Sequence, residues 1–281
     1  MSDDYELIDS GAGCKLERFG RYVLQRPCSQ ALWRKSAPEE VWARADAKFD
    51  REDGNRWFGR SNLPREWQIE TAGIRFRLGG TDFGHLGIFP EQRAQWRWIR
   101  ETVAKRRAAS GSVSVLNLFA YSGGSTMAAA LGGAEVCHLD ASKGMVEWAR
   151  ANAALNGLAS GPVRWIVDDA HKFMKREIRR ARRYDAIVLD PPTFGRGAGG
   201  ETYKIERDLA QTLCLVRELL SANPLFVLFS SHTPGLSRIV AENILAQLFP
   251  SAVLESGEML LEGRSLSCPS GIFCRAVFNL V

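Results

Sequence analysis

Four polar motifs in the second half of the chain could do chemistry together. They are the turn FAYSGG at residues 119–124, the single Asp140, the pair of aspartates at 168–169, and DPPTF at 190–194. Each follows an apolar run of strand length. In an open parallel sheet, ligands bind outside the carboxyl ends of the strands. We therefore expect the four motifs to meet at one edge of a sheet.

The first three motifs suit a nucleotide. Glycines at 123 and 124 let the backbone turn tightly beside a ligand, and Asp140 comes 17 residues after Gly123. This is close to the roughly 20-residue spacing at which an acid accepts hydrogen bonds from a ribose. The aspartates at 168–169 could accept from an adenine amino group. Each aspartate could instead cap the helix that follows, and Ser142 could cap the helix after Asp140.

The fourth motif suits a nucleobase held for reaction. Proline has a fixed φ and no N–H, and it restricts the residue before it, so Asp190 is followed by stiff backbone at Pro191 and Pro192. Asp190 can accept from a base amino group, and Phe194 offers a stacking face. The alternative is a stiff loop without a ligand.

Apolar runs of strand length alternate with segments of helical period from residue 114 onward, which predicts βαβ units and a parallel sheet. The expected strands lie at 114–120, 135–141, 163–169, 184–190 and 225–231, and the expected helices at 126–131, 145–155, 172–182, 203–220 and 238–248. Two further apolar runs at 252–261 and 272–281 predict a terminal antiparallel hairpin. The predicted fold is therefore an α/β Rossmann-like sheet of seven strands.

The front of the chain has a different pattern. Short alternating runs at 21–26, 67–71 and 74–78 predict half-buried strands, and residues 39–46 predict a short helix after Pro38. The polar, basic segment 105–114 predicts a boundary between modules. We therefore expect a small α+β module at 1–104 and the sheet domain at 105–281.

Composition narrows the class of protein. The chain has 281 residues, 45% of them hydrophobic, and six cysteines with no CxxC pair, so neither a zinc site nor a disulfide scaffold is indicated. No signal peptide or membrane-spanning run is visible, which favours the cytoplasm.

The net charge is +5, and residues 106–183 hold 12 Lys and Arg against 6 Asp and Glu. Six basic residues follow the spacing of one helical face: Lys172, Lys175, Arg176, Arg179, Arg180 and Arg183. This stripe could bind phosphates of a nucleic acid, or it could be a solvated outer face.

These motifs also resemble a known family. The runs VLNLFAYSGGST, LDASKGMVEWARANAALNG and VRWIVDDAHKFMKREIRRARRYDAIVLDPPTFGRG resemble S-adenosylmethionine-dependent methyltransferases related to the bacterial ribosomal RNA cytosine-C5 and guanine-N7 enzymes. KLERFGRYVLQRP, QALW and FGHLGIFPEQRAQW resemble a shorter branch, without the extra N-terminal RNA-binding domain of the cytosine enzymes. The resemblance implies a class I methyltransferase fold, S-adenosyl-L-methionine as cofactor, and RNA, most of all ribosomal RNA, as substrate, with no metal.

The resemblance also implies roles for residues. Those near the cofactor would be Phe119, Tyr121, Gly123, Asp140, Ala141, Asp168 and Asp169, with Gln92 and Arg93 closing over it from the smaller module. Asp140 would hold the ribose hydroxyls and Asp169 the adenine. Asp190, Pro191 and Phe194 would face the target base as the catalytic group.

The methylated atom depends on a cysteine. Cytosine C5 becomes nucleophilic only after a thiolate adds to the ring, and in the family's cytosine enzymes a cysteine follows the fifth strand. Here residues 230–236 read SSHTPGL, which favours attack by a nitrogen such as guanine N7. Cys268, in the predicted terminal hairpin, could still reach the site, although an ordinary buried thiol is the simpler interpretation. His232 could be a general base or a structural hydrogen-bonding group.

Other functions stay open at this point. An NAD-dependent oxidoreductase would use a similar sheet, but the chain lacks the GxGxxG turn and DPPTF would have no role. A methyltransferase of the same fold could also act on protein or a small molecule, or the chain could bind the cofactor without methylating anything.

Overall fold

The computed structural model describes residues 3–51, 54–197 and 200–278. The chain forms two compact units. Unit 1 comprises residues 1–93 and 260–270, and unit 2 comprises residues 94–259 and 271–281. The expected division between residues 104 and 105 therefore differs from the division in the structure, and the segment 260–270 returns to unit 1.

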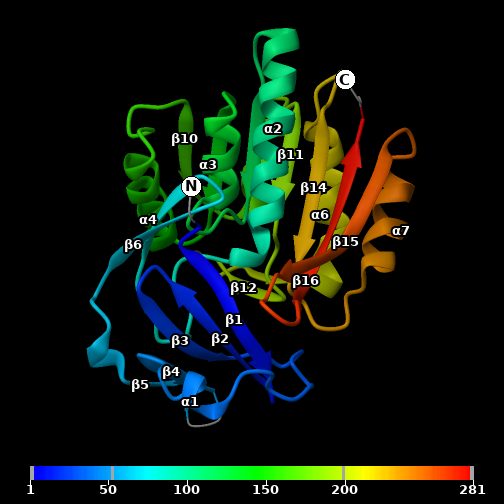
Figure 1. Ribbon diagram of the computed structural model, residues 1–281. Coiled ribbons are helices and arrows are strands. Elements are labelled where there is room, and N and C mark those ends of the chain that lie inside the picture. The colour runs from blue at the N-terminus through cyan, green and yellow to red at the C-terminus, as the bar shows by residue number, and fades with distance from the viewer. Residues whose placement is uncertain (1–2, 52–53, 198–199, 279–281) are drawn as a thin grey trace. The chain divides into compact units, whose positions relative to one another are not determined.

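Unit 1 is built mainly from short strands, shown in blue and cyan in Figure 1. One sheet has the order β1-β2-β3-β4-β5, and β6 and β7 form a separate hairpin. The strands are β1 (Tyr5–Gly11), β2 (Cys14–Phe19), β3 (Tyr22–Pro27), β4 (Ala47–Asp50), β5 (Arg56–Phe58), β6 (Trp67–Thr71) and β7 (Ile74–Leu78). The three strands expected from the sequence are confirmed as β3, β6 and β7, while the expected helix at 39–46 is only α1 (Glu39–Trp42).

Unit 2 contains the predicted seven-stranded sheet, with the order β10-β9-β8-β11-β14-β16-β15. Its strands are β8 (Ser114–Leu118), β9 (Glu135–Asp140), β10 (Val163–Val167), β11 (Ala186–Leu189), β14 (Phe226–Ser231), β15 (Val253–Leu261) and β16 (Cys268–Val277). Strands β8 to β11 and β14 are parallel, and β16 runs antiparallel to β14. Every residue of β11 and of β14 is buried, as expected for a parallel sheet covered on both faces.

Helices cover both faces of this sheet. They are α2 (Arg93–Ser110), α3 (Gly124–Leu131), α4 (Lys143–Leu155), α5 (Ala170–Arg179), α6 (Ile205–Leu219) and α7 (Arg238–Leu248). In Figure 1, α2 passes in front of the sheet and α6 lies behind β14. The helices α5, α6 and α7 pack in sequence, and α3 packs against α4. None of the helices in the described ranges is long and apolar enough to cross a membrane.

The expected boundary segment at 105–114 is partly helical instead. Residues up to Ser110 form the last turns of α2. Arginine and alanine are good helix formers, and Arg106 is buried where its guanidinium donates to the carbonyl oxygen of Asn223 at 2.8 Å. This contact joins the end of α2 to the loop before β14 within unit 2 and explains why the segment is not a linker.

The basic helix is shorter than predicted. It begins after Asp169 and ends at Arg179, because Ala181 adopts a left-handed φ of 55°. The N–H of Arg182 donates to the carbonyl of Glu177 and that of Ala181 to Ile178, which is the Schellman arrangement at a helix end. Arg180 caps the helix and Arg183 lies beyond it, so the predicted stripe retains four helical members.

Close packing between α2 and α3 gives a prediction about stability. A Cβ on Gly124 would lie 2.5 Å from the Trp96 ring, whereas one on Gly144 would meet nothing nearer than 3.9 Å. Both glycines lie in the first turn of a helix. We expect Gly124→Ala to lower the free energy of unfolding by about 1–3 kcal/mol through overpacking. Gly144→Ala should raise it by up to about 1 kcal/mol.

Urea denaturation of the two variants beside the unaltered chain measures both effects. A Gly124→Ala midpoint equal to or above that of Gly144→Ala would show that Trp96 does not pack there as described.

Candidate active site

The hydrogen-bond register of the parallel strands brings their carboxyl ends to one edge. Leu118 at the end of β8 is aligned with Leu139 of β9 and with Leu189 of β11. Val167 at the end of β10 is aligned with Asp140. The motifs at 119–124, 140, 168–169 and 190–194 therefore all follow strands at the same edge of the sheet in unit 2, as the sequence predicts.

The turn after β8 has an unusual backbone. Phe119 and Tyr121 have positive φ values of 54° and 49°, and Gly123 has 89°. Left-handed backbone costs a non-glycine residue about 1–2 kcal/mol. Such conformations persist only where the surrounding structure enforces them, and they gather at functional sites. Gly123 is the N-cap of α3, so the N-terminus of that helix opens toward this edge.

The carboxylate of Asp140 links two of the strand ends. Its Oδ2 accepts from the N–H of Tyr121 and its Oδ1 from the N–H of Ser142, each at 2.8 Å. Burial raises the pKa of Asp140, and the two amide donors oppose that rise. The helix cap is Ser142, whose side chain accepts from the N–H of Met145. Asp140 is therefore not a cap, and it sets the position of the turn at Tyr121.

The two aspartates after β10 already have protein partners. Asp169 is the N-cap of α5 and accepts from the N–H of Lys172 at 2.9 Å. Asp168 accepts from the N–H of Asp169 at 2.8 Å and pairs with the guanidinium of Arg176. The cap considered as an alternative for these residues is thus present at Asp169.

The DPPTF motif follows β11 directly. Asp190 is partly buried and Pro191 buried, whereas the Phe194 side chain is 49% exposed. Phe194 begins the short strand β12 (Phe194–Arg196), which pairs with β13 (Thr202–Lys204). An aromatic face is therefore held in solvent by a small hairpin, a few residues from a strand-end carboxylate.

Residues after β14 lie beside this motif. Nδ1 of His232 is 3.5 Å from Oδ1 of Asp190. The hydroxyls of Thr193 and Thr233 are 2.9 Å apart. His232 thus lies next to the DPPTF motif, and residues 230–236 contain no cysteine.

One aromatic cluster at this edge was missed from the sequence. The Phe119 and Tyr203 rings lie 5.2 Å apart, and His171 contacts Thr212 at 2.8 Å beside Tyr203. Burial raises the pKa of Tyr203 to about 12. The sequence pattern placed Tyr203 in a helix, but it belongs to β13, and a single tyrosine before an amphipathic run gives no signal for this packing.

The family match decides the class of protein. Residues 20–231 match the family described as S-adenosylmethionine-dependent methyltransferase. The chain belongs to this family. Its fold is the class I Rossmann-like methyltransferase fold, and its cofactor is S-adenosylmethionine.

Solved structures agree with this assignment. A SAM-dependent methyltransferase from Agrobacterium tumefaciens is 38% identical, with a TM-score of 0.93 over 99% of this chain and 91% of that chain. A SAM-dependent methyltransferase from Streptococcus mutans is 19% identical, with a TM-score of 0.74 over 98% of this chain and 75% of that one. The second likeness concerns the fold alone.

Curated relatives are longer proteins. The "Ribosomal RNA large subunit methyltransferase K/L" of Pseudoalteromonas translucida is 29% identical over 203 residues, which are 72% of this chain and 27% of that protein. The protein of the same name from Shewanella frigidimarina is 35% identical over 156 residues, 55% of this chain and 21% of its own length. This methyltransferase chain thus spans about a quarter of the length of these relatives.

The residues at the sheet edge fit an adenosine-bearing cofactor. The Asp140 carboxylate follows β9, and a left-handed turn and a helix N-terminus without a side-chain cap follow β8. A carboxylate can accept from ribose hydroxyls, and a helix N-terminus can bind a carboxylate. Ala141 lies between Asp140 and Ser142, partly buried. Among the residues that the structure describes, no group of three or more His, Cys, Asp or Glu could hold a metal ion.

The remaining predicted residues lie in unit 1. Gln92 is buried in the short helix η2 (Pro90–Gln92). Arg93 pairs with Asp3 at 3.0 Å and lies over the Tyr5 ring. Cys268 is fully buried at the start of β16, with its sulfur 3.2 Å from that of Cys28, which agrees with the simpler interpretation of a buried thiol.

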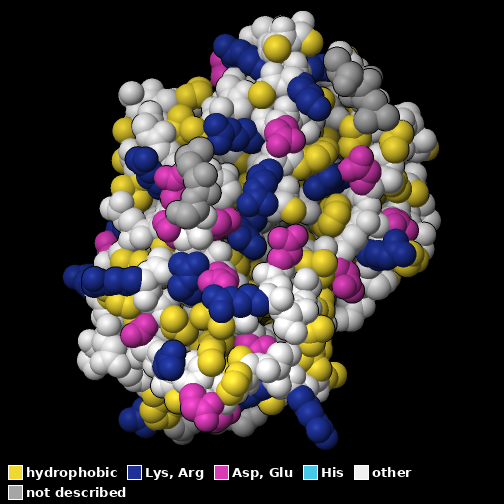
Figure 2. All heavy atoms as spheres, viewed as in Figure 1, with side chains coloured by type: hydrophobic (Ala, Val, Ile, Leu, Met, Phe, Trp, Pro, Cys, Tyr) yellow, Lys and Arg dark blue, Asp and Glu magenta, His cyan; other side chains and the backbone are white. Residues whose placement is uncertain are grey.

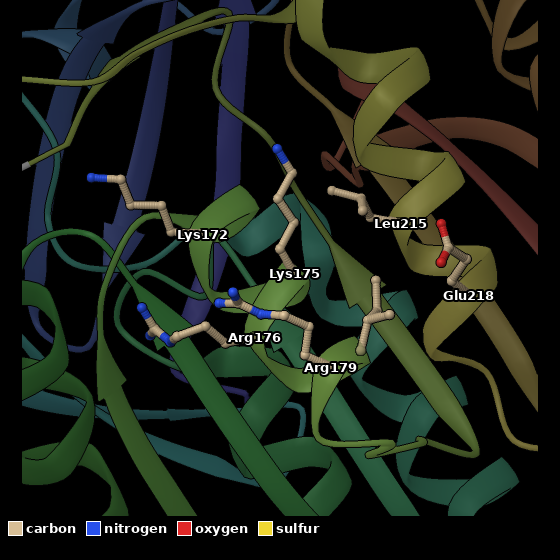
Figure 3. A pocket seen from close by; sticks show the side chains of 7 residues that line it. Lys172, Lys175, Arg176, Arg179, Leu215 and Glu218 are labelled. Atoms are coloured by element: carbon tan, nitrogen blue, oxygen red, sulfur yellow. The ribbon is translucent and has the colours of Figure 1, made fainter.

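A basic pocket of about 520 Å³ lies between α5 and α6. Figure 3 shows Lys172, Lys175, Arg176 and Arg179 extending from α5, with Leu215 and Glu218 on the opposite side. Lys172 pairs with Glu201 and Arg176 with Asp168, whereas Lys175 and Arg179 have no ion pair within the described ranges. On the face drawn in Figure 2, basic side chains are interspersed with acidic ones. The lining of the pocket, by contrast, has four basic residues and a single acidic one.

Asp140 gives a prediction about cofactor binding. Asp140→Asn keeps the shape but removes the charge and replaces one acceptor oxygen with a donor, which disturbs the turn at Tyr121 and weakens the expected acceptance from a ribose hydroxyl. A hydrogen bond to a charged group contributes about 1.5–3 kcal/mol. We therefore expect the affinity of the methyltransferase for S-adenosylhomocysteine to fall about 10- to 150-fold by calorimetry.

Asp185 provides the matched control. It precedes β11 at the opposite edge of the sheet, where its carboxylate accepts from Ser114 and Ser221 at 2.8 Å. Asp185→Asn should lower the melting temperature without changing the affinity. Equal affinity losses in the two variants would indicate a general loss of folding rather than a contribution from the cofactor edge.

Proposed function

We propose that this protein is a cytoplasmic methyltransferase that transfers the methyl group to a nitrogen atom of a base in ribosomal RNA. The observation that carries the proposal is the end of β11, where the Asp190 carboxylate, buried Pro191 and exposed Phe194 ring follow one another. A carboxylate that accepts from a base edge, next to an aromatic face that stacks on it, is how an extruded base is held.

The proposed cofactor site uses the other strand ends. Asp140 accepts from the ribose hydroxyls, and the turn containing Phe119, Tyr121 and Gly123 lines the methionine and ribose portion. Asp168 and Asp169 form the adenine end. One carboxylate oxygen of Asp169 already accepts from the N–H of Lys172. The proposed acceptor for the adenine amino group is therefore another carboxylate oxygen of Asp168 or Asp169. Gln92 and Arg93 remain the proposed closing residues.

A nitrogen target agrees with the residues beside Asp190. The sulfonium of the cofactor supplies an activated methyl group, so a nucleophilic nitrogen needs only alignment with it. Attack by cytosine C5 would need a thiolate against the base. The residues after β14 at this edge are Ser230, Ser231 and His232, and Cys268 is fully buried against Cys28.

Support for an RNA substrate comes from two independent features. Curated relatives carry the name ribosomal RNA large subunit methyltransferase K/L, and α5 lines a basic pocket. The alternative is a methyltransferase of the same fold that acts on protein or a small molecule. Tritiated methyl transfer to total RNA, total protein and a small-molecule extract distinguishes them by where the label appears.

Substitution of Asp190 tests its proposed role. Asp190→Ala should reduce kcat for methyl transfer to ribosomal RNA about 10- to 150-fold, the effect of losing one or more hydrogen bonds to a charged group. Affinity for S-adenosylhomocysteine should stay the same, because Asp190 is not among the proposed cofactor residues. Cys268→Ala should keep kcat within about threefold.

The substrate for this measurement is ribosomal RNA from a strain that lacks the gene, and the modified nucleoside is identified by mass spectrometry. The proposal predicts a base methylated on nitrogen. A product of 5-methylcytosine, or loss of activity in Cys268→Ala with its fold intact, would refute the nitrogen assignment.

The basic pocket gives a separate prediction about RNA affinity. Lys175 and Arg179 line it without an ion pair in the described part of the chain, so their charge is available to phosphates. Lys175→Glu with Arg179→Glu should weaken RNA binding. The slope of log affinity against log salt should decrease by about 1.5, because each lost phosphate contact contributes roughly 0.7–0.9.

The control reverses two exposed charges on α2, Arg100→Glu with Lys105→Glu. This variant changes the net charge equally and should leave the salt slope nearly unchanged. If both double variants reduce the slope by the same amount, the pocket is no more than part of a general positive field.

A further inference from the structure

Two cysteine thiols face each other in unit 1. The sulfur atoms of Cys28 and Cys268 are 3.2 Å apart, although the residues are 240 positions apart in the sequence. Cys28 follows the last residue of β3, and Cys268 begins β16 within the segment 260–270 that belongs to unit 1. Both are free thiols in this structure. The fold therefore holds a dithiol whose sulfurs already touch.

Their surroundings make the two thiols unequal. Cys28 is partly exposed, whereas Cys268 is fully buried. A hydrogen bond from Cys268, the Lys15 ammonium and the backbone N–H groups near Gln30 and Ala31 outweigh burial and lower the pKa of Cys28 to about 6. The same contact with Cys28, together with burial, raises the pKa of Cys268. Cys28 is thus the accessible thiolate at neutral pH, and Cys268 is its protonated neighbour.

A buried cluster of charged residues holds the Lys15 ammonium near the two sulfur atoms. Lys15 is almost fully buried and its Nζ lies 3.3 Å from Oε1 of Glu17. Glu17 also pairs with buried Arg26 at 2.7 Å and accepts from the hydroxyl of Tyr5 at 2.9 Å. With two cations around one carboxylate, positive charge remains beside the sulfurs. Low thiol pKa values arise next to such cations.

We propose that Cys28 and Cys268 form a peroxide-reactive site in which Cys28 is oxidised first and Cys268 closes a reversible disulfide with it. This modification site does not depend on the proposed methyl transfer. Its oxidant is hydrogen peroxide, and its product joins the segment 260–270 covalently to the end of β3.

The chemistry has two steps. The Cys28 thiolate attacks one oxygen of hydrogen peroxide, the O–O bond breaks, and hydroxide leaves to give a sulfenic acid. The sulfur of Cys268 then attacks the Cys28 sulfur, loses its proton, and displaces the hydroxyl, which leaves as water. In total two thiols lose two electrons and two protons to one peroxide, and two water molecules form.

Peptide mapping of the full chain tests the proposal directly. The protein is treated with one equivalent of hydrogen peroxide, alkylated, digested with trypsin without reduction, and analysed by mass spectrometry. We expect a linked pair of peptides, residues 22–34 with residues 265–275, that disappears after dithiothreitol. Because residues 265–275 also contain Cys274, the link should persist in Cys274→Ala and be absent in Cys268→Ala.

Variants separate the two roles. In Cys268→Ala, the sulfenic acid at Cys28 should persist and be trapped by dimedone, while Cys28→Ala should give neither product. Cys14→Ala is the matched control, since Cys14 is a partly exposed cysteine of the same unit, and it should form the link normally. Loss of the Cys268 hydrogen bond should also shift the pH midpoint of Cys28 alkylation upward by more than one unit.

Two results would overturn the proposal. One is a peroxide-treated, natively folded chain that carries sulfenic acid or sulfinic acid at Cys28 but no link to Cys268. The other is alkylation of Cys28 in the unaltered chain with a midpoint near 8.5, the ordinary cysteine value. Neither result depends on whether a cysteine variant folds.

Discussion

The carboxylate of Asp140 holds the candidate active site together. It ends β9 and accepts from the backbone of Tyr121, which follows β8, so two successive strand ends are joined by one partly buried acid. The positive φ values at Phe119 and Tyr121 are unfavourable for these residues, and this hydrogen bond helps to offset their cost. Any ligand that replaces water at this edge meets a turn whose shape is already set.

The parallel sheet was predictable because burial on both faces leaves a simple pattern. Strand β11 is apolar along its whole length, and β14 is apolar up to two buried serines at its end, so the polar residue that follows or ends each apolar run is easy to see. Parallel register then places those ends at one edge. The sequence pattern therefore predicts the positions of Asp140, Asp168 and Asp190 at or just after the ends of their strands, as the structure has them.

Features that depend on contacts distant in sequence were not predictable in this way. The two hydrogen bonds that Asp140 accepts need the turn after β8, and the contact of Cys28 with Cys268 joins opposite ends of the chain.

Helix α2 is a different case. Trp96, Ile99 and Val103 recur at helical spacing and are buried, but the many arginines around them and the small residues after them resemble a linker. The helical spacing of the apolar residues was therefore visible in the sequence, but the basic and small residues around them made the segment look like a linker.

The proximity of His232 to Asp190 bears on the choice among nitrogen atoms. Guanine N7 has a free lone pair and no proton to lose, so Asp190 would only need to accept from the base and orient it. An exocyclic amine must lose a proton after methylation. The Asp190 carboxylate lies 3.5 Å from the partly exposed His232 imidazole, so in the proposed function both groups would lie beside that amine. In the proposed function, this pair would orient guanine N7 or would take a proton from an exocyclic amine, whereas neither residue supplies the thiolate that carbon requires.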